Sequence, residues 1–447
     1  MTTEQIEAVT YKRIFLLSTP IVISNFAVPL LGMVDTAVIG NTQNAAAIGA
    51  VAIGAMIFSF VFFLFDFLSM VTSGLSAQAY GRSFKQPSQM RELSLILARG
   101  FVFALLLAGL ILLLQQPFMN LALWWFDLSP EMERQTTSYF QIRIWAAPVT
   151  LSTFVVLGWL IGLQRTGLVM ILMLFTQTTN ILLDFLFVLH FDMGIQGVAY
   201  ASLIAEYSAF GLGIFMVYRA IPHKFKGLMS ELKLADFISL MSANMDLFIR
   251  NLCIEASFMT IAKLGLKISD VVVAANAILM HLFLAMAYAT DGFAQAAESL
   301  TGEALGRKNK TTYKQAFVKT LVFSIFVATL FSLFYFLLGS WLAGLFTQIE
   351  GVLQVVEEHL VWVVLIPLTS IVSMHFDGVF VGATRSREMR NAMLVALAGF
   401  LVLVFPLYNQ FGNHGIWAAI NVFMLLRGLC LGWYLPRMFA DSNFKQY

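Results

Sequence analysis

Long apolar runs constrain this 447-residue chain more than any other feature of its sequence. Each run reaches or exceeds about 20 residues, the length that an α-helix needs to cross the hydrocarbon core of a bilayer. The runs fall roughly at residues 14–39, 48–79, 93–116, 139–163, 168–190, 194–218, 236–262, 271–304, 317–346, 358–383, 390–409 and 415–436. We therefore expect an all-α polytopic membrane protein with twelve transmembrane helices.

The composition excludes a water-soluble protein. Hydrophobic residues make up 59% of the chain and charged residues only 12%, against about 25% charged in soluble domains. The basic residues lie in short runs between apolar segments and form no single patch, so we expect no nucleic-acid binding. Cys253 and Cys430 lie inside apolar segments, so we expect no disulfide framework. The first apolar run is too long for a signal-peptide core and is expected to stay uncleaved.

The distribution of Lys and Arg predicts the orientation of the chain in the membrane. If the N-terminus is cytoplasmic, 19 of the 27 basic residues fall in cytoplasmic segments and five within helices. Only Arg134, Lys263 and Lys267 fall on the opposite side. Because basic residues concentrate in cytoplasmic loops, we expect both termini in the cytoplasm.

The sequence repeats itself. "DFLSMVTSGLSAQAYGR" (66–82) and "DGFAQAAESLTGEALGR" (291–307) both begin with Asp and end in Gly-Arg. Three further pairs follow in the same order: Pro148 and Pro367, "GLQRTG" (162–167) and "GATRSR" (382–387), and "GIQGVAYA" (194–201) and "GIWAAINV" (415–422). We expect two parallel six-helix repeats, an N-lobe (1–218) and a C-lobe (236–447), joined by a cytoplasmic linker (219–235).

The first apolar run carries an acid on a polar, small-residue face. Asn25, Pro29, Gly32 and Asp35 recur there at helical spacing. An acid at mid-bilayer costs roughly 2.5–3.5 kcal/mol on insertion scales, so it indicates function by default. Pro20 and Pro29 each remove a backbone hydrogen bond, and we expect them to act as a conformational hinge.

The fifth run, "TTNILLDFLFV" at its centre, places Gln177, Asn180 and Asp184 along one stripe. A buried carboxylate without a fixed cation binds a proton more tightly, and a nearby second acid strengthens this effect. Alternatively, Asp35, Asn180 and Asp184 offer oxygen ligands to sodium, with Ser202 adding a hydroxyl. The residue types leave proton and sodium both open, and they indicate no other metal.

A second acidic site is expected in the C-terminal half. Glu255 lies within "LCIEASFM", and Asp377 continues a stripe with Ser370 and Ser373. Transport and packing roles are equally compatible with these two acids.

The remaining intramembrane acids are interpreted differently. Asp66 and Asp291 are equivalent positions of the repeat, and a paired structural role fits them as well as transport does. Asp246 is expected to pair with Arg250 one helical turn away and to be structural. Glu206 and Glu298 receive no role.

Taken in order, "PLLGMVDTAVIG", "GLSAQAYGR" and "NILLDFLFV" resemble the MATE (multidrug and toxic compound extrusion) transporters over essentially the whole chain, and the DinF-like branch in particular. The resemblance implies an antiporter of the bacterial inner membrane that exports cationic or amphipathic drugs, with protons favoured over sodium as the coupling ion and no other cofactor. It also implies an N-lobe coupling cluster of Asp35, Asn180 and Asp184, a contributing Asp66, a hydroxyl at Ser202, and C-lobe acids Glu255 and Asp377.

Three other functions are weighed against drug export. A lipid-linked oligosaccharide flippase of the same superfamily would want a basic cavity, whereas intramembrane acids outnumber bases here. A major-facilitator carrier usually has a Gly-Asp-Arg-rich loop that "AQAYGRSFKQPS" lacks. A membrane-embedded enzyme would need a nucleophile or metal cluster, and the six histidines show no ligand spacing. We therefore expect a transporter that is not an enzyme and has no obligate protein partner.

Overall fold

A computed structural model describes residues 9–40, 45–84, 90–126, 128–220, 231, 234–440 and 444. Within these ranges the chain is helical and has no strand. In chain order the helices are α2 (Tyr11–Gly40), α3 (Ala45–Phe65), α4 (Phe67–Ser83), α5 (Met90–Leu113), α6 (Gln115–Phe126), α7 (Pro130–Arg143), η2 (Ile144–Ala146), α8 (Ala147–Gly162), α9 (Thr166–Asp184), η3 (Phe185–His190), α10 (Gly194–Ala220), α11 (Leu234–Leu266), α12 (Asp270–Gly306), α13 (Lys310–Phe346), α14 (Glu350–Gly382), α15 (Ser386–Phe411) and α16 (Asn413–Met438).

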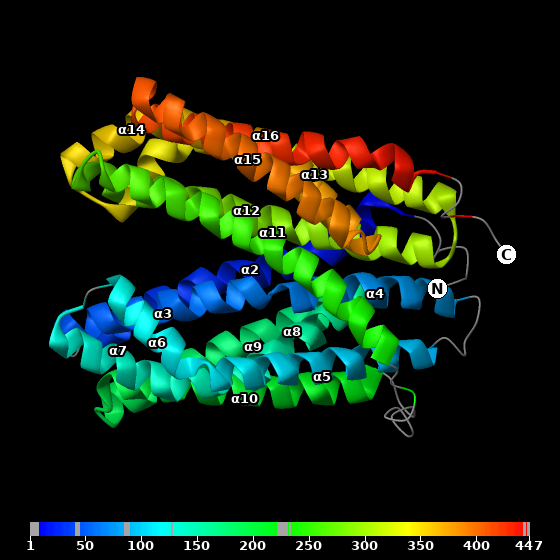
Figure 1. The fold of residues 1–447 in the computed structure, drawn as a ribbon, viewed down its shortest axis with the longest axis horizontal. Helices are drawn as coiled ribbons and strands as arrows, with labels where there is room; N and C mark the ends of the chain where they lie inside the picture. The colour runs from blue at the N-terminus through cyan, green and yellow to red at the C-terminus, as the bar shows by residue number, and fades with distance from the viewer. Residues whose placement is uncertain are drawn as a thin grey trace. The chain divides into compact units, whose positions relative to one another are not determined.

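The predicted all-α fold with twelve membrane-spanning segments is confirmed. Eleven helical spans among the described residues are long and apolar enough to cross a bilayer, and α2 accounts for the first apolar run. The long second run consists of two helices, α3 and α4, that meet at Asp66, whereas the long eighth run is the single 37-residue helix α12 (Figure 1).

The described chain forms two compact units. One contains the described residues between 23 and 240, and the other contains the described residues up to 22 and from 241 onward. Both boundaries fall inside helices, α2 and α11, so each of these helices contributes to both units. The division between two lobes at residues 218 and 236 stays a prediction, and most of the expected linker, at 221–230 and 232–233, lies outside the described residues.

Small residues bring two helices of the 23–240 unit into backbone contact. A methyl group on Gly158 of α8 would overlap the Ser69 carbonyl oxygen of α4. One turn on, a methyl group on Gly162 would lie 2.6 Å from the carbonyl oxygen of Ser73. Glycines spaced by four let membrane helices approach this closely, because no side chain separates the backbones.

The same contact recurs in the other unit. There the two glycines lie on α14, 220 residues after Gly158 and Gly162 in the sequence. Methyl groups on Gly378 and Gly382 of α14 would overlap the carbonyl oxygens of Ala294 and Glu298 on α12. These oxygens lie 225 residues after their counterparts on α4, which is the offset of the sequence repeat. The predicted duplication therefore extends to individual backbone contacts.

The turns that follow the two glycine helices are also equivalent. Gln164 and Thr384 adopt left-handed backbone conformations with φ of 59° and 54°. The next residue in each turn donates its backbone N–H across it, from Arg165 to Leu160 at 2.8 Å and from Arg385 to Phe380 at 2.9 Å.

The structure corrects the repeat register of the last helix in each half. Gly194, the first residue of α10, and Gly412, the residue before α16, have φ of +54° and +57°. Three residues on, Gly197 and Gly415 each approach the backbone of the preceding helix, at Phe187 and Leu407. The offset is therefore 218 residues, and the predicted match of 194 with 415 was shifted by three.

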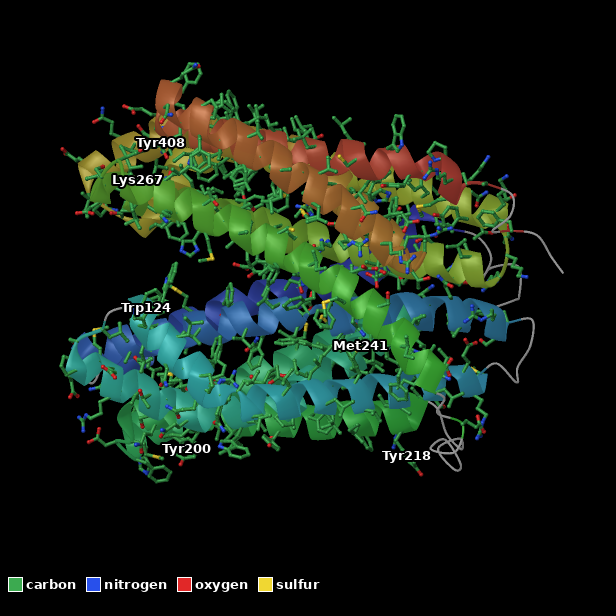
Figure 2. All side chains as sticks on the ribbon, in the orientation of Figure 1. Trp124, Tyr200, Tyr218, Met241, Lys267 and Tyr408 are labelled. Atoms are coloured by element: carbon green, nitrogen blue, oxygen red, sulfur yellow. The ribbon has the colours of Figure 1, made fainter. Side chains whose placement is uncertain are left out.

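Exposed aromatic residues mark the depth of the bilayer on α10. Figure 2 shows Tyr200 and Tyr218 near opposite ends of this helix, and both side chains are exposed. Eighteen residues of α-helix span about 27 Å at 1.5 Å per residue, close to the roughly 30 Å thickness of a hydrocarbon core. Tyr side chains favour the two membrane interfaces, so the part of α10 between Tyr200 and Tyr218 is long enough to cross a bilayer. A third exposed tyrosine, Tyr207, lies between them, and Ser202 lies about 3 Å along the helix from Tyr200.

Candidate functional site

The polar stripe of the fifth predicted helix faces the interior of its unit. Asn180 of α9 is 3% exposed and donates from Nδ2 to the Ser202 hydroxyl of α10 at 2.8 Å. The Asn180 amide oxygen is buried and accepts no hydrogen bond from the described part of the chain. An inward-facing oxygen acceptor is thus available inside the unit, toward the Tyr200 end of α10.

Asp184 lies one turn beyond Asn180 on the same face. It is fully buried, and it is the last residue of α9 before the helix widens into the π-helical turn η3. Such π turns within helices occur frequently at functional sites. Asp184 therefore lies where the backbone changes from α-helix to π-helix. The apolar pattern of residues 168–190 does not predict this change.

The second half of the protein lacks this polar cluster. By the offsets that the glycine contacts define, the counterparts of Asn180 and Asp184 are Phe400 and Val404, and the counterpart of Ser202 is Ile420. All three counterparts are buried in the apolar core of their unit. The shared scaffold therefore packs well without polar groups at these positions, which points to a function for the cluster.

The Asn180–Ser202 hydrogen bond can be tested directly. Replacing Ser202 with alanine leaves a buried amide donor without an acceptor, which costs about 1–3 kcal/mol. Replacing Ser202 with threonine keeps the hydroxyl. We expect thermal unfolding in detergent to show a lower midpoint for Ser202→Ala than for Ser202→Thr. Equal midpoints would show that the hydrogen bond adds no stability.

Sequence reasoning missed an ion pair in the same unit. Arg143, the last residue of α7, donates from Nη2 to Glu206 of α10, and the Thr150 hydroxyl donates to the second carboxylate oxygen. The Arg143 and Glu206 side chains are 12% and 16% exposed. Glu206 lies one turn from Ser202 on α10 and so continues the polar face of the Asn180 cluster. The sequence did offer a signal for this pair, because Arg143 and Glu206 are opposite charges that lie within two different apolar runs.

Asp377, one of the two acids of the expected second site, lies in an ion-pair cluster, and its coupling role stays a prediction. Asp377 Oδ2 accepts from Arg250 of α11 at 2.6 Å and from Arg427 of α16 at 2.7 Å. The expected pair between Asp246 and Arg250 was wrong, because Asp246 pairs with Arg390 of α15 at 2.6 Å. Arg250 reaches α14 through Nη2, and its Nη1 donates to Asn251 on its own helix at 2.8 Å.

The other predicted site residues are spread over several elements. Gln177 and Glu255 are half-buried on α9 and α11, and Glu255 forms no ion pair with any described residue. Asp66 joins α3 to α4, and Pro20 lies inside α2, which continues through it. The side chains of Pro29 and Asp35 on α2 lie outside the described part, so their roles stay predictions.

Twelve membrane helices in two duplicated halves, with buried carboxylates and amides at membrane depth, define a polytopic transporter. The MatE family matches residues 20–186 and 247–408 of the chain. DNA damage-inducible protein F of Escherichia coli K12 is 39% identical over 424 residues, which cover 94% of this chain and 91% of that protein. The chain therefore belongs to the MATE family of multidrug and toxic compound efflux transporters and is not an enzyme.

Solved structures share the fold. The D35N mutant of the Vibrio cholerae MATE transporter VcmN matches with a TM-score of 0.86 at 20% identity, covering 97% of this chain and 98% of that one. A MATE transporter in the bent conformation matches with a TM-score of 0.88 at 18% identity over the full length of both chains. The motifs suggested VcmN as the individual transporter, but a chain 20% identical to VcmN is a different protein, and at this identity the likeness concerns the fold alone.

Proposed function

We propose that the protein exports organic cations across the bacterial inner membrane in exchange for protons, by alternating access, with both termini in the cytoplasm. The observation that carries this proposal is the buried Asn180–Ser202–Asp184 cluster, which only one of the two repeated halves contains. A carboxylate at this depth binds either a proton or a cationic ligand, and it thereby makes their binding mutually exclusive.

The energetics support exchange. Moving a monovalent cation outward against an inside-negative potential costs about 2.3 kcal/mol per 100 mV, so an inward cation must offset that cost. In our proposal, protonation of Asp35 and Asp184 rearranges α2 around Pro20 and Pro29 and releases the substrate outward.

The ion pair of the 23–240 unit argues against an anionic substrate beside the Asn180 cluster. Glu206 neutralises Arg143, and a cavity for anionic lipid-linked sugars would need unpaired positive charge there. In the other unit, Arg250 and Arg427 share the single carboxylate of Asp377. Sodium is the alternative coupling ion, because the amide oxygen of Asn180, which accepts no hydrogen bond from the described residues, is a suitable ligand for it.

The test is uptake of a fluorescent organic cation into proteoliposomes under an imposed proton gradient or an imposed sodium gradient. We expect proton-driven exchange, and we expect Asp184→Asn to lower it at least about tenfold because the amide cannot carry a proton. Asp192→Asn is the matched control, since Asp192 is exposed eight residues further on, and should leave the rate unchanged. Full exchange by Asp184→Asn would overturn the role of Asp184, and exchange driven by sodium alone would replace the proton.

A further inference from the structure

We propose that Glu206 and the rings of Phe58 and Phe62 form a binding site for an organic monocation, and that Arg143 is a tethered cation that fills this site when no ligand is bound. The Arg143 guanidinium carbon lies 5.6 Å from the Phe58 ring centre and 5.8 Å from the Phe62 ring centre. Its Nη2 donates to Glu206, whose other oxygen accepts from Thr150.

This arrangement has the chemistry of organic-cation recognition. Aromatic faces within about 6 Å attract a cation through the ring quadrupole, and quaternary ammonium ligands are bound in such aromatic cages. The carboxylate supplies the opposite charge in a region sheltered from water. Arg143 therefore makes the contacts that a planar or aromatic monocation would make in its place.

Arg143 is incompletely held where it lies. A guanidinium carries five N–H donors. Arg143 hydrogen-bonds Glu206 and Tyr139, but its Nη1 is buried with no acceptor among the described residues. Leaving a buried donor without an acceptor weakens the arginine's hold on the site. A ligand that needs no hydrogen bonds, such as a phosphonium or quaternary ammonium ion, loses nothing at that position.

The repeat shows that the scaffold does not need this ion pair. Counted from Pro148 and Pro367, the counterpart of Arg143 is Trp362 on α14, and the counterpart of Glu206 on α16 is Met424. Both belong to the apolar cluster of the second half. Buried ion pairs can generally be replaced by packed apolar residues without loss of fold. The charges of Arg143 and Glu206 occur in the first half and have apolar counterparts in the second, which is the pattern expected of a binding site.

The proposal rests on the proposed export of organic cations, and binding measurements on the full-length purified protein separate the two. The probe is tetraphenylphosphonium, and the neutral triphenylphosphine oxide is the control ligand. Arg143→Met removes the tethered cation, and we expect it to tighten tetraphenylphosphonium binding about tenfold with little change for the neutral ligand. Arg143→Met/Glu206→Gln is the charge-balanced control and should lose the gain.

Each outcome decides the inference. Unchanged or weaker tetraphenylphosphonium binding by folded Arg143→Met overturns it, as does an equal gain for the neutral ligand, which would show only that space was created. If Arg143→Met does not fold, Arg143→Lys, which loses the planar group between the rings, should give a smaller gain, and no gain overturns the inference. Proton-driven exchange that depends on Asp184 without any effect of Arg143 would leave the proposed function standing. No binding by any form would overturn both.

Discussion

Replacing Asp377 with asparagine should be among the most destabilising single substitutions in the protein. Asp377, Arg250 and Arg427 come from three helices, and their side chains are 12%, 10% and 5% exposed. The asparagine would leave two buried guanidinium groups without a carboxylate. Removing one partner of a buried ion pair typically costs about 3–5 kcal/mol. Thermal unfolding in detergent, followed by size-exclusion chromatography, measures the loss.

Removing one of the two guanidinium groups should recover part of this stability. In Asp377→Asn/Arg427→Met one buried guanidinium instead of two lacks a carboxylate, so we expect an unfolding midpoint between those of Asp377→Asn and the wild type. Glu131→Gln serves as a surface control: its pair with Arg134 is largely exposed, and exposed pairs add little stability. A folded Asp377→Asn protein with wild-type stability and no ion coupling would return Asp377 to the coupling role that the sequence predicts.

The second large effect is expected at the glycines that join α4 to α8 and α12 to α14. Gly158→Ala and Gly378→Ala each place a methyl group on a backbone carbonyl of the facing helix. Forcing extra volume into a packed contact typically costs about 1–3 kcal/mol, and more where the obstacle is backbone. We expect a lower unfolding midpoint for both variants, and similar losses because the two contacts are equivalent in the repeat.

The matched controls are Gly211→Ala on α10 and Gly344→Ala on α13. Nothing lies within 4 Å of a methyl group at either position. Alanine favours a helix over glycine by about 1 kcal/mol, so these variants should be as stable as the wild type or slightly more stable. Equal behaviour of all four variants would show that the close helix contacts do not limit stability.

Local sequence patterns predicted much of the architecture. The length of the apolar runs predicted the membrane helices, because a helix of fixed rise must cover a fixed thickness of hydrocarbon. The spacing of Asn180 and Asp184 predicted a shared face, since four residues make about one turn. The break between α3 and α4 at Asp66 and the π-helical turn after Asp184 were not predicted. An apolar run continues across each of them, so the hydropathy of the sequence gives no sign of them.

The sequence by itself determined the membrane class, the duplication and the polar stripe, because each follows from a short-range period or a repeated motif. Only the tertiary structure decided which charges meet. Asp377 pairs with arginines 50 and 127 residues away, and Arg143 meets Glu206 at a separation of 63 residues. Helix faces rich in apolar residues offer several packing partners of similar energy, so the partner of a buried charge depends on the assembled neighbours and is not encoded in any one segment.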